Sequence, residues 1–150
     1  MKNIVGENIN RILYSRNISQ EQLANLSGLS RQTINSLVSI TKQIDPKLST
    51  IFKLSTALDI ELIQFFERRE NFDHRKNKNV TFEDYYNTLI QNVKSYTHLF
   101  TQKSLSSNPG LSESYISHLL NFKINDIHIS TLEKLSKQID IEITELLKRG

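Results

Sequence analysis

The stretch SQEQLANLSGLSRQTINSL, residues 19–37, has the pattern of two short helices joined by a tight turn. Ser19, followed three residues later by Gln22, forms a capping box that opens a helix. Gly28 allows the left-handed backbone that commonly ends a helix, and Ser30 supplies an N-cap for the next one. Two helices joined in this way predict a compact, steeply crossed pair.

The second helix of the pair, expected over residues 31–39, separates into an apolar and a polar face. Ala24 is small enough to let the two helices approach closely, and the apolar side chains expected to point inward are Leu23, Leu29, Ile34 and Leu37. The outward positions are then Arg31, Gln32, Asn35 and Ser36. Arginine pairs with guanine, and glutamine and asparagine pair with adenine, at base edges in the major groove. The sequence therefore predicts a helix that reads duplex DNA from its N-terminal end.

With its flanks, this segment resembles the phage-repressor helix-turn-helix family (Cro/CI-like, or Xre-type). The resemblance covers about residues 5–66 and rests on Gly6-Glu7, Ser19-Gln20, Leu23-Ala24, Gly28-Leu29-Ser30 and Asp59-Ile60-Glu61-Leu62. It implies a five-helix, lambda-repressor-like domain in which Gln20 touches backbone phosphate and supports the recognition helix. It also implies base contacts from Arg31, Gln32 and Ser36, with Thr33 and Asn35 as further contacts. Lys42, beyond the helix, completes the predicted DNA-binding set.

The pattern returns later in the chain at a nearly constant spacing. Gly28-Leu29-Ser30 recurs as Gly110-Leu111-Ser112, and Asp59-Ile60-Glu61 recurs as Asp140-Ile141-Glu142, at offsets that differ by a single position. Solenoid repeats are shorter, about 20–50 residues, so this period fits two copies of a whole small domain.

We therefore predict an all-α chain of two tandem five-helix, lambda-repressor-like helix-turn-helix domains. They cover residues 1–67 and 81–150, and a short charged linker covers residues 68–80. Ser49 and Ser130 are expected to cap the fourth helix of each copy, and Asp59 is expected to open the fifth helix of the first.

The second copy diverges from the family at the positions that would meet DNA. Glu113 occupies the place of Arg31, and residues 81–150 carry seven Lys/Arg against eight Asp/Glu, whereas residues 1–66 carry seven against five. Two interpretations stay open, packing or dimerisation alone, or a second DNA-binding helix. The residues of that helix would be Gln102, Glu113, Ser114, Tyr115, Ser117 and His118.

Composition limits the other classes of function. The 150 residues contain no cysteine, which excludes disulfides and thiolate chemistry, and the net charge of +3 permits nucleic-acid binding without demonstrating it. No signal core and no run of ~18 apolar residues occurs, so we expect a cytoplasmic protein without a membrane segment. Neither an acid–base or nucleophile constellation nor a zinc-ligand spacing is visible, so we expect no enzyme, no cofactor, no metal and no small-molecule ligand.

The sequence thus predicts a repressor-like, sequence-specific transcriptional regulator that binds double-stranded operator DNA. We expect a homodimer that reads an inverted repeat through its first domain. Two domains in one chain could also imitate such a dimer, and a monomer of this kind would need an asymmetric site. The alternative is an antitoxin- or adaptor-type protein-interaction module in which DNA binding is secondary.

Overall fold

The computed structural model of the protein describes residues 4–39, 44–68, 80–97 and 111–148. These residues form eight α-helices and one 3-10 helix, with no strand among them, so the all-α prediction is confirmed. The chain divides into two compact units, Met1–Asn79 and Val80–Gly150. Residues 69–79 of the predicted linker lie outside the described part of the chain. Within the described ranges, no helix has both the length and the apolar character needed to cross a membrane.

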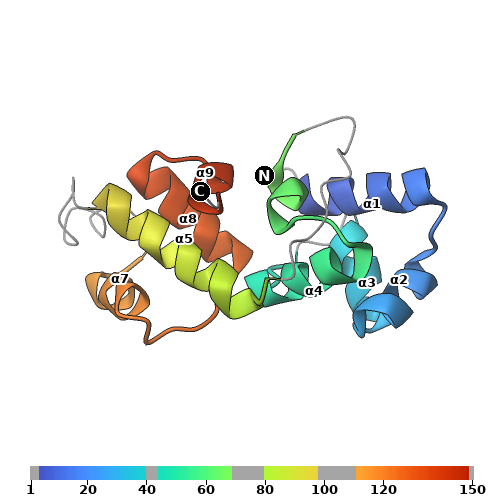
Figure 1. Ribbon diagram of the computed structural model, residues 1–150, viewed down its shortest axis with the longest axis horizontal. Helices are drawn as coiled ribbons and strands as arrows, with labels where there is room; N and C mark the ends of the chain where they lie inside the picture. Colours follow the sequence, from blue (N-terminus) through green and yellow to red (C-terminus); the bar gives the residue numbers. More distant parts are fainter. Residues whose placement is uncertain (1–3, 40–43, 69–79, 98–110, 149–150) are drawn as a thin grey trace. The chain divides into compact units, whose positions relative to one another are not determined.

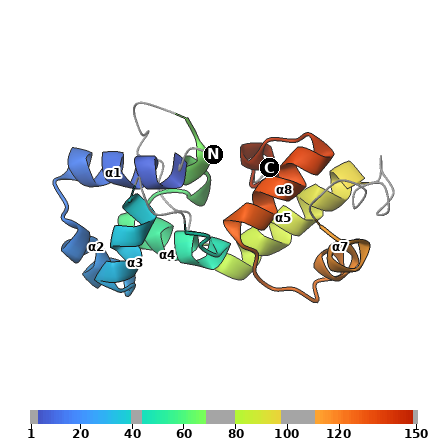
Figure 2. The same ribbon diagram turned by 180° about the vertical axis from the view of Figure 1, so that it is seen from behind.

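The first unit contains α1 (Ile4–Arg16), α2 (Gln20–Ser27), α3 (Arg31–Val38), α4 (Leu48–Leu58) and the 3-10 helix η1 (Leu62–Phe66). Helix α1 packs against α3 and η1, while α2 packs against α3 and α4 (Figures 1 and 2). These contacts enclose one apolar core, whose fully buried side chains include Ile9, Leu23, Ile34, Ile51, Leu54 and Phe65.

The turn between α2 and α3 forms as the sequence predicts. The Ser19 Oγ accepts a hydrogen bond from the Gln22 backbone N–H, and the Gln22 side chain accepts one from the Ser19 N–H. Gly28 ends α2 in the left-handed region, with φ +75°, and donates its N–H to the Ala24 carbonyl. The Ser30 hydroxyl then caps α3 by accepting from the Thr33 N–H. Each of these features follows from a residue and its near neighbours in the sequence.

Gly28 offers a test of this turn, because in the described part of the chain no atom beyond its immediate neighbours lies within 4 Å of a Cβ added there. Replacing Gly28 with alanine therefore introduces backbone strain without a clash, and should lower the free energy of unfolding by about 1–2 kcal/mol. Chemical denaturation of the full chain measures the loss. Gly28→Asn is the matched control, because asparagine tolerates the left-handed region better than alanine, and it should lose less. Equal losses in the two variants would contradict the strain explanation.

Two of the predicted helix boundaries in the first unit are wrong. Helix α4 begins at Leu48 with Lys47 as its N-cap residue, so Ser49 lies inside the first turn and does not cap it. Burial of Leu48 places the start of the helix one residue ahead of the best capping side chain. Asp59 ends α4, with φ +53° and its N–H donated to the α4 carbonyls, and does not open a fifth helix. Aspartate is among the residues that tolerate this conformation.

The second unit contains α5 (Phe82–Thr97), α7 (Glu113–Leu120), α8 (Ile129–Ile139) and α9 (Ile143–Leu146). Thr81 opens α5 by accepting from the Asp84 N–H, and Ser112 caps α7 as Ser30 caps α3. The N-cap residue of α8 is His128, so the prediction that Ser130 caps this helix is wrong. The reason is the same as at Ser49, because the first residue of the helix, Ile129, is buried. Gln102 lies outside the described residues.

In each unit, one asparagine of the first helix donates hydrogen bonds to backbone carbonyls at the end of the last described helix. We call this contact the asparagine clasp. In the first unit the Asn8 Nδ2 donates to the carbonyls of Phe65 (2.8 Å) and Glu67 (2.9 Å). In the second the Asn92 Nδ2 donates to the carbonyls of Leu146 (2.8 Å) and Lys148 (2.9 Å). The acceptors correspond in pairs at the offset that relates Asp59 to Asp140, but the interval between the two asparagines is longer. This common feature supports the internal repeat, and a second copy of the whole domain stays a prediction.

Candidate nucleic-acid interface

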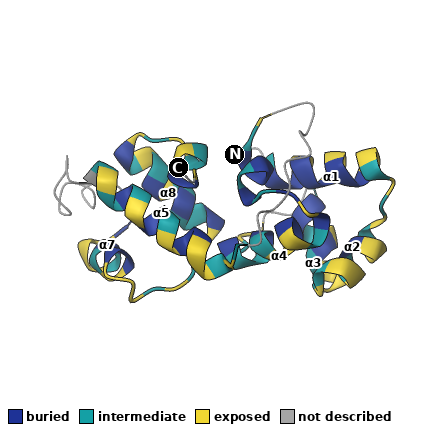
Figure 3. Cartoon of the chain, in the orientation of Figure 1, coloured by how far each residue is buried: buried dark blue, intermediate teal, exposed yellow. Residues whose placement is uncertain are grey.

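Helices α2 and α3 lie side by side and share one buried face (Figures 1 and 2). Leu23 from α2 and Ile34 and Leu37 from α3 are buried in the core, as the sequence predicts. Leu29, in the turn between the helices, is only partly buried. The pair therefore presents its remaining face to solvent, and Figure 3 shows exposed residues along that side of α2 and α3.

The predicted base-reading residues fall into two groups by exposure. Arg31, Gln32 and Asn35 are exposed on α3, whereas Thr33 and Ser36 are partly buried. The Thr33 hydroxyl is hydrogen-bonded to the Ser30 hydroxyl at 2.8 Å, so Thr33 is engaged in the cap of α3. Among the predicted set, Arg31, Gln32 and Asn35 are the side chains best placed to meet a ligand in solvent.

The remaining two members of the predicted set stand outside α3. Gln20 is the first residue of α2 and is partly buried. A residue there lies among the N-terminal backbone N–H groups of the helix, which favour a nearby phosphate. Lys42 lies outside the residues that the structure describes.

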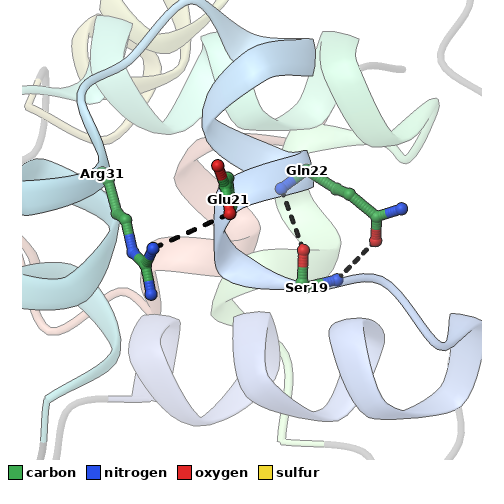
Figure 4. Close-up of polar contacts among 4 residues, drawn as sticks. All are labelled: Ser19, Glu21, Gln22 and Arg31. Atoms are coloured by element: carbon green, nitrogen blue, oxygen red, sulfur yellow. Dashed lines mark hydrogen bonds and ion pairs between the residues drawn. The ribbon is translucent and has the colours of Figure 1, made fainter.

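An ion pair joins the two helices at the exposed face. The Arg31 Nη1 lies 3.7 Å from the Glu21 Oε2, with side-chain exposures of 69% and 71% (Figure 4). Glu21 is not among the residues that the sequence singles out, because it precedes Arg31 by ten positions and only the crossing of α2 and α3 brings them together. The arginine expected to meet DNA therefore has an acidic neighbour.

The corresponding helix of the second unit, α7, offers a different surface. Glu113, Ser114 and His118 are exposed, and Ser117 is partly buried, with its carbonyl accepting from the Asn121 amide at 2.8 Å. An acid thus stands exposed at the first position of α7, where α3 has Arg31.

Tyr115 differs from its predicted outward position. It is partly buried, its hydroxyl makes a hydrogen bond with the Thr131 side chain, and burial raises its pKa. Tyr86 lies close to it, donates its hydroxyl to the Ile124 carbonyl at 2.7 Å, and has a pKa raised by burial. Tyr115 is therefore turned partly into the unit, where burial removes apolar ring surface from water while its hydroxyl keeps a hydrogen-bond partner.

Comparison with known protein families gives a match within the first unit. Residues 10–65 match the Helix-turn-helix family model. The match contains α2, α3 and α4 complete, and it ends inside η1. It indicates that this segment is a DNA-binding helix-turn-helix and that the chain is a DNA-binding regulator. The matched residues stop before the second unit.

Neither the curated proteins nor the solved structures gave a match to this chain. Among the described residues, no group of three or more His, Cys, Asp or Glu side chains is suited to hold a metal ion.

Proposed function

We propose that this protein is a repressor-like transcriptional regulator that binds specific double-stranded DNA and reads the major groove with α3. One observation carries the proposal. Arg31, Gln32 and Asn35 stand exposed on a helix whose other face is buried, inside the segment that matches the helix-turn-helix family model.

The proposed contacts follow from where these side chains lie. Arg31 and Gln32 are the first two residues of α3, and the N-terminal residues of such a helix meet base edges. The Arg31 guanidinium can give two hydrogen bonds to O6 and N7 of guanine, while Gln32 or Asn35 can pair with adenine. Gln20, at the start of α2, would hold a backbone phosphate and so fix the register of α3 on the duplex.

For the second unit, we propose assembly or a smaller DNA contact. Glu113 replaces the arginine at the start of the helix, Tyr115 is partly buried, and acids outnumber bases in residues 81–150. Phosphates repel an acid at this place unless it accepts from cytosine N4. A homodimer that places two first units on an inverted repeat fits this division, because α3 begins with an arginine and α7 begins with an acid.

The proposed activity needs no bond-making chemistry, so we propose that this protein is not an enzyme. We also propose that it acts on DNA in the cytoplasm. The excess of acids in residues 81–150 also favours a second candidate, an antitoxin- or adaptor-type module whose main partner is a protein. The two candidates differ in their behaviour towards duplex DNA. Selection of binding sites from random duplexes should enrich one sequence if the proposal is right, and none if the second candidate is right.

Arg31→Ala tests the reading helix. It should weaken binding to the selected duplex by about 1–3 kcal/mol and relax the preference at one base pair, because a bidentate contact is lost. The exposed side chain is not part of the core, so circular dichroism should be unchanged. Repeated site selection with the variant measures the preference.

Arg31→Lys is the matched control. Lysine keeps the charge but lacks the planar fork, so base preference should fall while the salt dependence of binding stays near that of the unaltered chain. If Arg31→Ala selects the same site as the unaltered chain, α3 is not the reading helix.

A further inference from the structure

We propose that Glu21 is a specificity-determining residue of the DNA interface. In this inference, which rests on the proposed function, the carboxylate keeps Arg31 directed to a base and disfavours its use on phosphates elsewhere. The Arg31 Nη1 and Glu21 Oε2 lie 3.7 Å apart, on the first turns of α3 and α2.

The carboxylate of Glu21 takes no part in the capping box of α2. That box is formed by Ser19 and Gln22 alone, through hydrogen bonds of 3.0 Å and 2.8 Å (Figure 4). Both side chains of the ion pair are about seventy per cent exposed, so the pair adds little to stability in water. The exposed position of Glu21 beside Arg31 suits it to act at a surface that binds DNA.

The chemistry of the guanidinium permits both partners at once. Arginine carries five N–H donors in a planar fork, and guanine uses only two of them. Glu21 can therefore keep its contact while Arg31 binds a base, and the pair strengthens as the interface excludes water.

A phosphate contact is different, because it brings a second anion close to the carboxylate, and like charges repel. The base contact is then favoured over the phosphate contact. Since nonspecific binding to DNA rests almost entirely on phosphate contacts, the acid lowers that binding in particular.

The test compares three single variants of the full chain, and it repeats Glu21→Gln in an Arg31→Ala background. Glu21→Gln removes the charge, and Glu21→Asp keeps it but shortens the side chain so that the contact at 3.7 Å is lost. Glu7→Gln is the matched control, because Glu7 is also an exposed acid in the first turn of a helix, α1, and its loss changes the net charge equally. Each is titrated with a random-sequence duplex and with the duplex that the unaltered chain selects, over a range of salt concentrations.

We expect Glu21→Gln to bind the random duplex about fivefold to tenfold more tightly, with a logarithmic salt slope steeper by roughly 0.9, as for one added phosphate contact. Binding to the selected duplex should change less, so the ratio of specific to nonspecific affinity should fall. Glu21→Asp should relax the preference at the base pair that Arg31 reads, with a salt slope near that of the unaltered chain. In an Arg31→Ala background, Glu21→Gln should leave base preference unchanged.

If Glu7→Gln has the same effects as Glu21→Gln, net charge alone is responsible and the inference is overturned. An unchanged affinity ratio in Glu21→Gln overturns it as well. If the unaltered chain itself shows no preference among duplexes, the proposed function has failed, and that result is read before any variant is made.

Discussion

Replacing Asn8 with alanine should lower the free energy of unfolding of the first unit by about 2–4 kcal/mol. Asn8 is fully buried, and its Nδ2 is the hydrogen-bond donor to the Phe65 and Glu67 carbonyls. Alanine would leave both carbonyls without this donor and remove the tie between α1 and the end of η1. The Asn8 Oδ1 has no partner among the described residues, and its removal offsets part of the loss.

The second unit supplies the matched comparison. Asn92 makes the same pair of hydrogen bonds, but it is only partly buried and its bond to Lys148 is exposed. Water can replace the lost donor there, so Asn92→Ala should cost less, about 1–2 kcal/mol. Native-state hydrogen exchange assigns the loss to one unit, because the amides of α1 and α5 report separately. A loss at Asn92 equal to that at Asn8 would contradict the dependence on burial.

Ile34→Ala should destabilise the first unit by about 2–5 kcal/mol and abolish binding to the selected duplex. Ile34 is fully buried on the inner face of α3, so its truncation leaves a cavity where α3 packs against α1 and α2. With the helix no longer held, Arg31, Gln32 and Asn35 lose their common geometry. Hydrogen exchange during denaturation of the unbound protein measures the stability of the first unit. An electrophoretic shift measures binding to the selected duplex.

Ile116→Ala is the control for that result, because Ile116 is fully buried at the matching place on α7. It should destabilise the second unit by a similar amount and leave the salt dependence of DNA binding largely unchanged. If it removes DNA binding as completely as Ile34→Ala does, the second unit is required on the DNA. The proposed division between the two units would then be wrong.

The parts of this fold that the sequence predicts well are those decided within three or four residues. The Ser19–Gln22 capping box, the left-handed Gly28 and the Ser30 cap all depend on neighbours in the chain, and all three are confirmed. The buried face of α3 follows from helical spacing alone, which places Ile34 and Leu37 on one side.

The parts that the sequence does not predict depend on distant contacts. The bond from Asn8 to Phe65 joins residues far apart in the chain, and nothing in the local pattern near Asn8 indicates a buried amide. The interval between the two clasp asparagines is longer than the interval between their acceptors, which hides the correspondence from a search at constant offset.

In the candidate site, too, the sequence predicts local features but not the contacts between residues that are distant in the chain. Its exposed members could be read from the helix pattern, but the pairing of Glu21 with Arg31 depends on how α2 and α3 cross. The partial burial of Tyr115 depends on neighbours such as Thr131 and Tyr86, which come from other helices. Helical spacing indicates a face, whereas the neighbours across that face come from the packing.

The asparagine clasps also link the folded state to slow covalent chemistry. Asparagine is among the residues least able to survive heat, since its amide can hydrolyse to a carboxylate, and a carboxylate has no N–H to donate. The reaction proceeds fastest when the next backbone nitrogen can turn towards the side-chain carbonyl. Asn8 and Asn92 lie within helices, and each precedes a β-branched residue, Ile9 or Val93, so that approach is hindered in both units. The folded helices therefore slow hydrolysis of the two asparagine amides, and each unfolding event removes this protection.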